Sequence, residues 1–194
     1  AARTRGKPIL VPLPALSARG PNRSRAGRAR SRLFPFSVPA HFFPTAIGIC
    51  GFGWNEAALT DFRLPSSSPA DAIESETPPA FLQPLIARVQ RHLRGSPEDF
   101  ADLPYALLGV TDFQRRVYRE TLAVKAGSTR SYGDLAAALA LPPGGSRAVA
   151  AALGANPWPL LIPCHRVIGS DGKLTGFSGP GGVATKAKLL ALEG

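Results

Sequence analysis

Residues 131–154 read SYGDLAAALALPPGGSRAVAAALG, and this stretch determines the architecture of the second half of the chain. Ser131–Asp134 is typical of a helix start, and the Ala-rich helix that follows should stop at Pro142–Gly145. Ser146 is expected to cap a further helix that ends near Gly154. Two short helices joined by a tight Gly-containing turn predict a helix-turn-helix, for which an ordinary helical hairpin is the alternative.

A third helix is expected just before this stretch. Thr111-Asp112-Phe113-Gln114 has the spacing of a capping box, and apolar residues then recur up to Leu122, before Gly127. The helix after Ser146 carries Arg147 at its start and small Ala side chains along its length. Small side chains let a helix backbone approach another surface closely, and the floor of a DNA groove is one such surface.

Strands dominate the region before the helices. Residues 45–64 are expected to form two strands, the first covered on both faces and the second alternating. In the second strand, Leu59, Asp61 and Arg63 should lie on the face opposite Phe62 and its neighbours. A Pro/Ser/acidic linker over residues 65–79 leads to a helix over residues 80–94. The fold class is therefore α+β: a small N-terminal strand/helix domain precedes a mainly helical domain with a helix-turn-helix and an active-site loop.

Composition divides the 194 residues into three parts: a disordered basic tail (1–40), an N-terminal domain (41–107) and a C-terminal domain (108–194). The tail could be inert, a nucleic-acid-binding arm or a targeting signal. Residues 33–112 carry a net charge of −5 and residues 113–194 a net charge of +6. The basic C-terminal third indicates a polyanion partner such as nucleic acid, and a solvated basic surface is the alternative.

Cysteine and histidine are scarce. A disulfide between Cys50 and Cys164 would close a very long loop, so a reducing compartment is expected, with Cys50 as a buried strand residue. His41, His92 and His165 show no metal-ligand spacing, so no structural zinc site or other metal is expected. We expect no cofactor either. No stretch reaches the roughly 20 apolar residues of a transmembrane helix, so no membrane partner is expected.

Cys164 lies in an apolar run, directly after Pro163 and before His165. A thiol becomes a good nucleophile when a nearby histidine or a helix N-terminus stabilises its thiolate. Neighbouring residues on a regular strand point to opposite faces, so a Cys–His pair would need a kinked backbone or a bridging water. An inert core cysteine is the alternative.

The hexapeptide Ile162–Val167 resembles the active-site signature of the O-6-alkylguanine-DNA alkyltransferases, also called methylated-DNA–protein-cysteine methyltransferases. The strong resemblance covers roughly residues 108–194, whereas residues 45–107 resemble the family's N-terminal domain only loosely. The flanking motifs follow one another in the family's order: Phe113-Gln114, Ser131–Ala136, Ser146–Val149, Asn156-Pro157, Gly172, Gly176–Gly179, Lys186 and Leu192–Gly194.

The resemblance implies irreversible, stoichiometric transfer of an alkyl group from a flipped-out O-6-alkylguanine in double-stranded DNA to Cys164. It implies four catalytic residues: Cys164 as nucleophile, His165 as base through water, Glu193 to orient His165, and Asn156 to brace the turn. It also implies that DNA and the base are bound by Arg147, which fills the stack, by Tyr132, which assists flipping, and by Ala148, Ala151, Val167 and Ser178.

Two departures from the family pattern stand out. Phe177 replaces a Tyr found in some members, and the loop at residues 179–182 is a residue or two longer, which leaves the register of Glu193 against His165 open. A non-catalytic protein that flags alkylated DNA and a helix-turn-helix regulator are the alternative functions. We expect a monomer in a bacterial-type cytoplasm, with organellar or nuclear targeting by the basic N-terminus as the alternative.

Overall fold

The computed structural model describes residues 39–66 and 75–194. Most of the predicted disordered tail and of the predicted linker over residues 65–79 lies outside these described residues. The expected tail boundary at residue 40 needs a correction, because Ala40 is the first residue of strand β1. The expected division near residue 107 remains a prediction.

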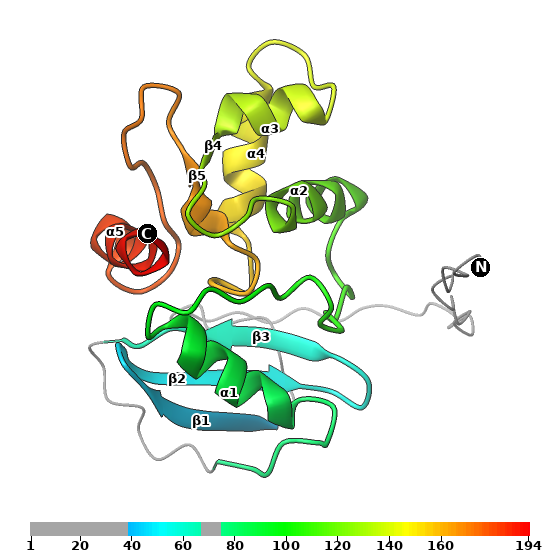
Figure 1. The fold of residues 1–194 in the computed structure, drawn as a ribbon. Helices are drawn as coiled ribbons and strands as arrows, with labels where there is room; N and C mark the ends of the chain where they lie inside the picture. The colour runs from blue at the N-terminus through cyan, green and yellow to red at the C-terminus, as the bar shows by residue number, and fades with distance from the viewer. Residues whose placement is uncertain (1–38, 67–74) are drawn as a thin grey trace, which may run out of the picture. The chain divides into compact units, whose positions relative to one another are not determined.

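Three antiparallel strands in the order β1-β2-β3 form the N-terminal sheet: β1 (Ala40–Thr45), β2 (Gly48–Trp54) and β3 (Leu59–Arg63) (Figure 1). The sequence predicted only the second and third of them, and residues 46–47 form a turn rather than the start of a strand. Pro44 weakens the strand pattern of β1, but it is tolerated because β1 lies at the edge of the sheet.

A β-bulge corrects the predicted alternation in β3. Gly53 pairs with Asp61 and Trp54 pairs with Leu59, which leaves Thr60 as the extra residue. Leu59 and Phe62 are consequently both buried, and the placement of Leu59 on the polar face with Asp61 was wrong.

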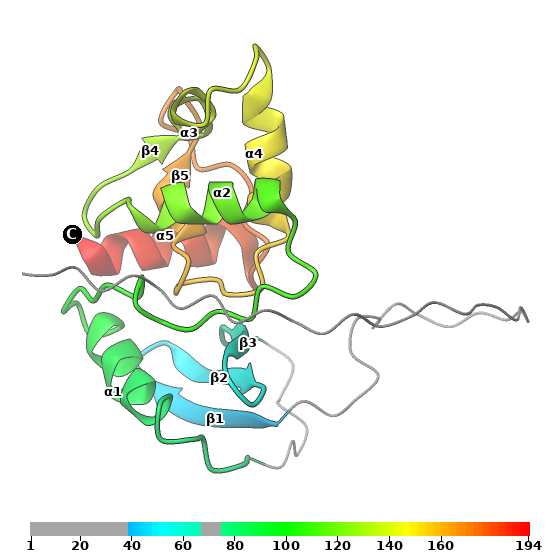
Figure 2. The same ribbon diagram turned by 90° about the vertical axis from the view of Figure 1, so that its right-hand side faces the viewer.

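Helix α1 (Gln83–His92) confirms the predicted helix with narrower bounds. Pro84 lies in the first turn, where its missing N–H costs no helical hydrogen bond. The helix buries Leu85, Val89 and His92, and it lies across one face of the sheet (Figures 1 and 2).

Three helices form the predicted helical part: α2 (Asp112–Leu122), α3 (Tyr132–Ala138) and α4 (Gly145–Gly154). The capping box of Thr111 and Gln114 is present, and α4 packs against both α2 and α3. Ser146 does not cap α4 as expected. Gly144 occupies the cap position with a φ of 86°, a left-handed conformation that glycine adopts without strain, and Ser146 lies within the helix.

The remaining elements include the turn that carries Cys164. They are β4 (Arg130–Ser131), the 3-10 helix η1 (Cys164–Arg166), β5 (Val167–Ile168), which pairs parallel to β4, and α5 (Gly182–Glu193). Strand β3 hydrogen-bonds directly to the segment that leads to Cys164. Trp158 Nε1 donates to the carbonyl of Leu59 at 3.0 Å, and Phe62 N–H donates to the carbonyl of Pro157 at 2.8 Å.

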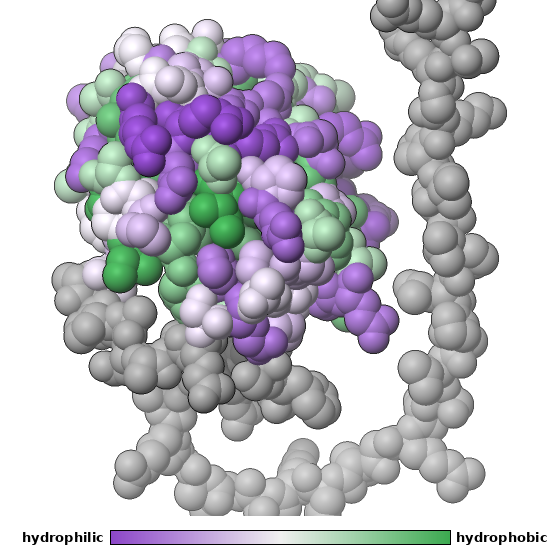
Figure 3. Space-filling model, turned by 60° about the horizontal axis from the view of Figure 1, so that its bottom comes forward, coloured by the Kyte–Doolittle hydropathy of each residue, from purple (hydrophilic) through white to green (hydrophobic). Residues whose placement is uncertain are grey.

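The described surface on the face shown in Figure 3 is mainly hydrophilic, with small separate hydrophobic areas. Single exposed apolar side chains are ordinary on a folded protein. Among the described residues, no helix combines the length and apolar character needed to cross a bilayer.

Candidate functional site

A sharp bend in the backbone presents Cys164. Pro163 has φ −79° and ψ 62°, the values of an inverse γ-turn, and Cys164 N–H donates to the carbonyl of Ile162 at 2.7 Å. The chain then continues as the 3-10 turn η1, with Arg166 N–H donating to Pro163 at 2.9 Å. Cys164 and His165 therefore do not lie on a regular strand, and the backbone kink that a Cys–His pair requires is present.

Asn156 ties together the turn that precedes the cysteine. Its side chain is buried, its Nδ2 donates to the carbonyl of Ile162 at 3.0 Å, and its Oδ1 accepts from Trp158 N–H at 3.0 Å. These two bonds hold the turn over residues 156–162 together.

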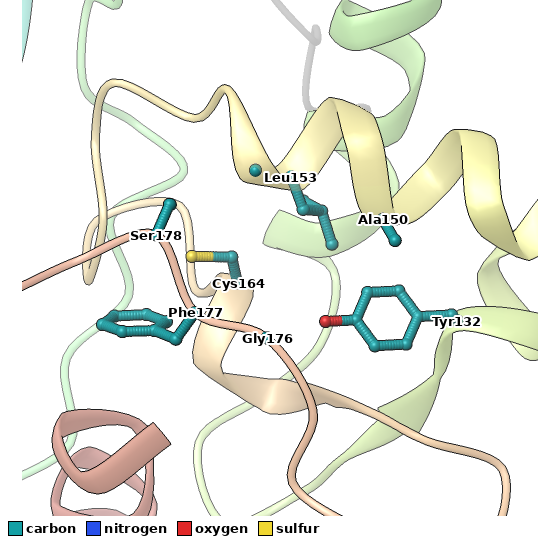
Figure 4. Close-up of a pocket in the computed structure, with 8 residues that line it drawn as sticks. Tyr132, Ala150, Leu153, Cys164, Gly176, Phe177 and Ser178 are labelled. Atoms are coloured by element: carbon teal, nitrogen blue, oxygen red, sulfur yellow. The ribbon is translucent and has the colours of Figure 1, made fainter. Parts of the chain in front are cut away.

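A cavity of about 240 Å³ opens beside the thiol. Its wall combines the start of α3, the end of α4, Cys164 and the segment 176–178. In Figure 4 the Tyr132 hydroxyl points toward Cys164, and the Phe177 ring lies on the side of Cys164 away from α4. The lining residues are Tyr132, Ala150, Leu153, Gly154, Cys164, Gly176, Phe177 and Ser178. Cys164 as a whole residue is only 5% exposed, yet it lines this cavity.

His165 and Glu193 form a buried pair. His165 Nε2 donates to Glu193 Oε1 at 2.9 Å, which also resolves the register that the loop at residues 179–182 left open. Nδ1 of His165 is buried and has no hydrogen-bond partner among the described residues. Because the proton sits on Nε2, the lone pair of Nδ1 can accept another proton.

Arg166 belongs to the same network. Its side chain is buried. Its Nη2 and Nε donate to the two carboxylate oxygens of Glu193 at 2.7 and 2.9 Å, and its Nη1 donates to the carbonyl of Val124 at 2.6 Å. Such a bidentate pair stabilises the ionised carboxylate inside the protein.

These contacts set the protonation states. Burial would raise the pKa of Glu193, but the hydrogen bonds from His165, His92 and Arg166 outweigh it and hold this pKa well below its usual range. Burial lowers the pKa of His165, and Glu193 opposes this only in part. The resting pair is therefore a neutral imidazole beside a carboxylate.

Burial raises the pKa of the Cys164 thiol, while the hydrogen bond from Asn156 and the charge of Lys186 act in the opposite direction. The thiol is consequently protonated at rest. A base must remove its proton before the sulfur can react efficiently.

Lys186 fixes the segment that carries the cavity wall. Its ammonium group donates to the carbonyls of Val167, Thr175 and Gly176 at 2.5, 3.0 and 3.2 Å. The same nitrogen lies 5.6 Å from the centre of the Tyr132 ring. The Tyr132 hydroxyl donates to the carbonyl of Thr175 at 3.2 Å, and burial raises the pKa of Tyr132, so this hydroxyl stays a hydrogen-bond donor.

His92, His165 and Glu193 offer ligand atoms within 4.8 Å of one another, the spacing of a metal site. Both histidine Nε2 atoms already hydrogen-bond to Glu193 Oε1, and the Arg166 guanidinium binds the same carboxylate. A cation there would face a buried positive charge, so we assign the cluster as a hydrogen-bond network.

Helix α4 presents one exposed face. Arg147, Ala148 and Ala151 lie on this face, whereas Val149 and Ala152 are buried against the core. Ala152 therefore serves in packing α4 against the core.

Val167 and Ser178 differ in their accessibility. Both backbone polar groups of Val167 are engaged, since its N–H donates to Cys164 and its carbonyl accepts from Lys186, and Val167 does not line the cavity. Ser178 is exposed and lies in the cavity wall.

The comparison with known proteins agrees with this geometry. The chain is 38% identical over 149 residues to a methylated-DNA–protein-cysteine methyltransferase of Mycolicibacterium paratuberculosis. The matched residues cover 76% of this chain and 87% of that protein. The chain belongs to the methylated-DNA–protein-cysteine methyltransferase family. Residues 112–194 match the family model described as the DNA-binding domain of 6-O-methylguanine DNA methyltransferase.

Further members extend the similarity. The family member of Methanothermobacter thermautotrophicus is 40% identical over 144 residues, covering 74% of this chain and 78% of that protein. Among solved structures, Mycobacterium tuberculosis OGT in complex with DNA matches with a TM-score of 0.66 and 36% identity, covering 80% of this chain and 92% of that one. The α+β fold class that the sequence predicted is therefore confirmed.

The sequence missed two members of the buried network. The sequence gives no motif that links His92 to Cys164, because His92 lies in the N-terminal region that resembles the family only loosely. Arg166 was visible within the signature hexapeptide, but an arginine directly after a histidine carries no sign of burial.

Proposed function

We propose that this chain repairs DNA by moving an alkyl group from O6 of a guanine to the sulfur of Cys164. Membership of the family makes the chain a DNA-repair methyltransferase whose acceptor is a protein cysteine. The observation that supports Cys164 as the acceptor is its thiol beside an open cavity, one residue from a buried His165–Glu193 pair.

The reaction begins with loss of the thiol proton. His165 Nδ1 takes this proton through a water molecule, and Glu193 stabilises the resulting imidazolium. The sulfur forms a bond to the alkyl carbon as the bond between that carbon and O6 breaks. The electron pair of the broken bond goes to guanine, which ends with the proton that left the thiol.

Hydrogen-bond donors accelerate this step when they face the charge that grows on guanine. Tyr132 supplies such a donor if its hydroxyl group turns from the carbonyl of Thr175 to the guanine. Ser178 also lines the cavity and is a second candidate donor. The thioether on Cys164 is stable, so each molecule acts once.

The target base must leave the helix stack to reach the cavity. The exposed face of α4 suits contact with DNA, because Ala148 and Ala151 permit close approach and Arg147 can occupy the space left by the base. DNA that contains O6-alkylguanine is therefore the proposed partner. Cys164, His165 and Glu193 come from one chain, so we propose that a monomer acts.

Both cysteines are free thiols, which suits a reducing compartment, and the cytoplasm is the compartment we propose.

Mass spectrometry after incubation with a duplex carrying one O6-methylguanine tests the proposal. We expect one methyl group per molecule on the peptide that contains Cys164 and none in Cys164→Ala. Cys50→Ala is the matched control and should react fully, because burial raises the pKa of Cys50 to about 11 and keeps it unreactive. Binding of the alkylated duplex without any gain in mass would indicate the lesion-flagging alternative, and selective binding of undamaged DNA would indicate a regulator.

A further inference from the structure

We propose that His92, from α1 in the N-terminal part of the chain, is a positioning residue for the transfer reaction: it holds Glu193 in the place from which Glu193 supports His165. This inference rests on the proposed function and extends its machinery beyond the region matched by the family model, which begins at residue 112.

Three donors converge on one oxygen of Glu193. His92 Nε2 lies 3.0 Å from Oε1, and the same oxygen receives His165 Nε2 at 2.9 Å and Arg166 Nη2 at 2.7 Å. The side chains of His92 and Glu193 are each 1% exposed. Water therefore does not replace the His92 donor if it is removed, and the carboxylate loses a hydrogen bond on the side that faces α1.

The proton of His92 is already in the required position. Glu98 N–H donates to His92 Nδ1 at 3.0 Å, so this nitrogen must carry a lone pair. In the neutral ring the proton then sits on Nε2 and points at Glu193. The Phe100 ring packs edge-on against the imidazole, with 5.5 Å between ring centres, and restrains its orientation further.

The position of Glu193 explains why such a restraint is useful. Glu193 is the last residue of α5, and the last turn of a helix lacks part of its backbone hydrogen bonding. The charged and titratable groups that face its carboxylate are His92 from α1 and His165 and Arg166 from η1. With His92 in place the carboxylate of Glu193 is held from both α1 and η1. Without His92, the carboxylate can keep its ion pair with Arg166 while it rotates away from His165 Nε2.

The test compares four variants by single-turnover methyl transfer at a saturating concentration of O6-methylguanine duplex, with duplex affinity and thermal unfolding measured in parallel. His92→Leu removes both polar atoms. His92→Gln places an amide nitrogen near the position of Nε2, whereas His92→Asn reaches only the position of Nδ1. Val89→Ala, in the same helix and fully buried, is the control that destabilises α1 without touching Glu193.

We expect His92→Leu and His92→Asn to transfer about tenfold more slowly, the size of one hydrogen bond to a charged group, with duplex affinity within about twofold of the wild type. His92→Gln should regain most of the rate, and Val89→Ala should melt earlier but react at full rate. The contrast between the Gln and Asn variants decides the matter even if the Leu variant does not fold.

Equal rates for His92→Gln and His92→Asn, or a His92→Leu rate within about twofold of the wild type, would overturn the inference and leave the proposed function intact. A wild-type protein that gains no methyl group would overturn both.

Discussion

His165 Nε2 lies 2.9 Å from Glu193 Oε1, and the exposed fractions of the two side chains are 0% and 1%. The two residues come from different elements, η1 and α5, so the packing of α5 against η1 sets this distance. A neutral imidazole with one nitrogen bound to a carboxylate and the other free is the arrangement of a general base.

Glu193→Gln should slow methyl transfer by at least about tenfold, because the amide cannot stabilise the His165 imidazolium. The variant should also unfold more easily, by about 3–5 kcal/mol, since the buried Arg166 guanidinium loses its charged partner. Single-turnover kinetics and urea unfolding measure the two effects. Glu56→Gln, at an exposed turn, is the matched control and should leave both unchanged. A Glu193→Gln variant of normal rate would refute the role of Glu193.

The pH dependence of transfer follows from the lowered pKa of His165. Burial, the main cause, places this pKa below 6.5, so the imidazole remains a neutral base as the pH falls to that value. The transfer rate should therefore stay level down to about pH 6.5 and decline only below it. Between the lowered pKa of His165 in the folded protein and its ordinary pKa of 6.5 in the unfolded chain, the unfolded chain binds more protons. The free energy of unfolding therefore also decreases as the pH falls through this range. Circular dichroism must show that the protein is still folded at each pH. A decline centred above pH 6.5 would contradict a neutral buried His165.

Lys186→Met should slow transfer by about tenfold or more and lower the melting temperature, because three carbonyls lose a shared charged donor and the wall at residues 175–178 loosens. Lys188→Met is the control, since Lys188 lies on the same helix but is exposed. Transfer kinetics and thermal unfolding distinguish the two variants. Equal behaviour of both would show that the three hydrogen bonds do not shape the cavity.

Arg147→Ala should separate base flipping from chemistry. Arg147 is exposed, so stability should change by less than about 0.5 kcal/mol. Transfer from a duplex should slow by about tenfold or more, because a few kcal/mol are needed to extrude a base. Transfer from the free base O6-methylguanine should be unchanged. Arg119→Ala, which removes an exposed arginine from α2, controls for general loss of positive charge. A loss of rate with the free base would place Arg147 in the chemistry instead.

Local signals in the sequence predicted the helical half of the fold. The capping box at Thr111, the helix start at Ser131 and the glycines at residues 144–145 each act within a few residues, so they can be identified without a structure. The Ile162–Val167 hexapeptide pointed to Cys164 as the proposed acceptor because it resembles the family's active-site signature. Strand β1 and the bulge in β3 escaped prediction because they depend on the pairing partner across the sheet.

Sequence alone therefore determined which residue types are available for the chemistry: one cysteine next to one histidine, after a proline that bends the chain. Only the tertiary structure decided that Glu193, Arg166 and His92 meet in one buried network, although about 100 positions separate His92 from Glu193 along the chain. The physical reason is that burial and charge pairing depend on how helices pack, and packing joins residues whose separation along the chain carries no information about their contact.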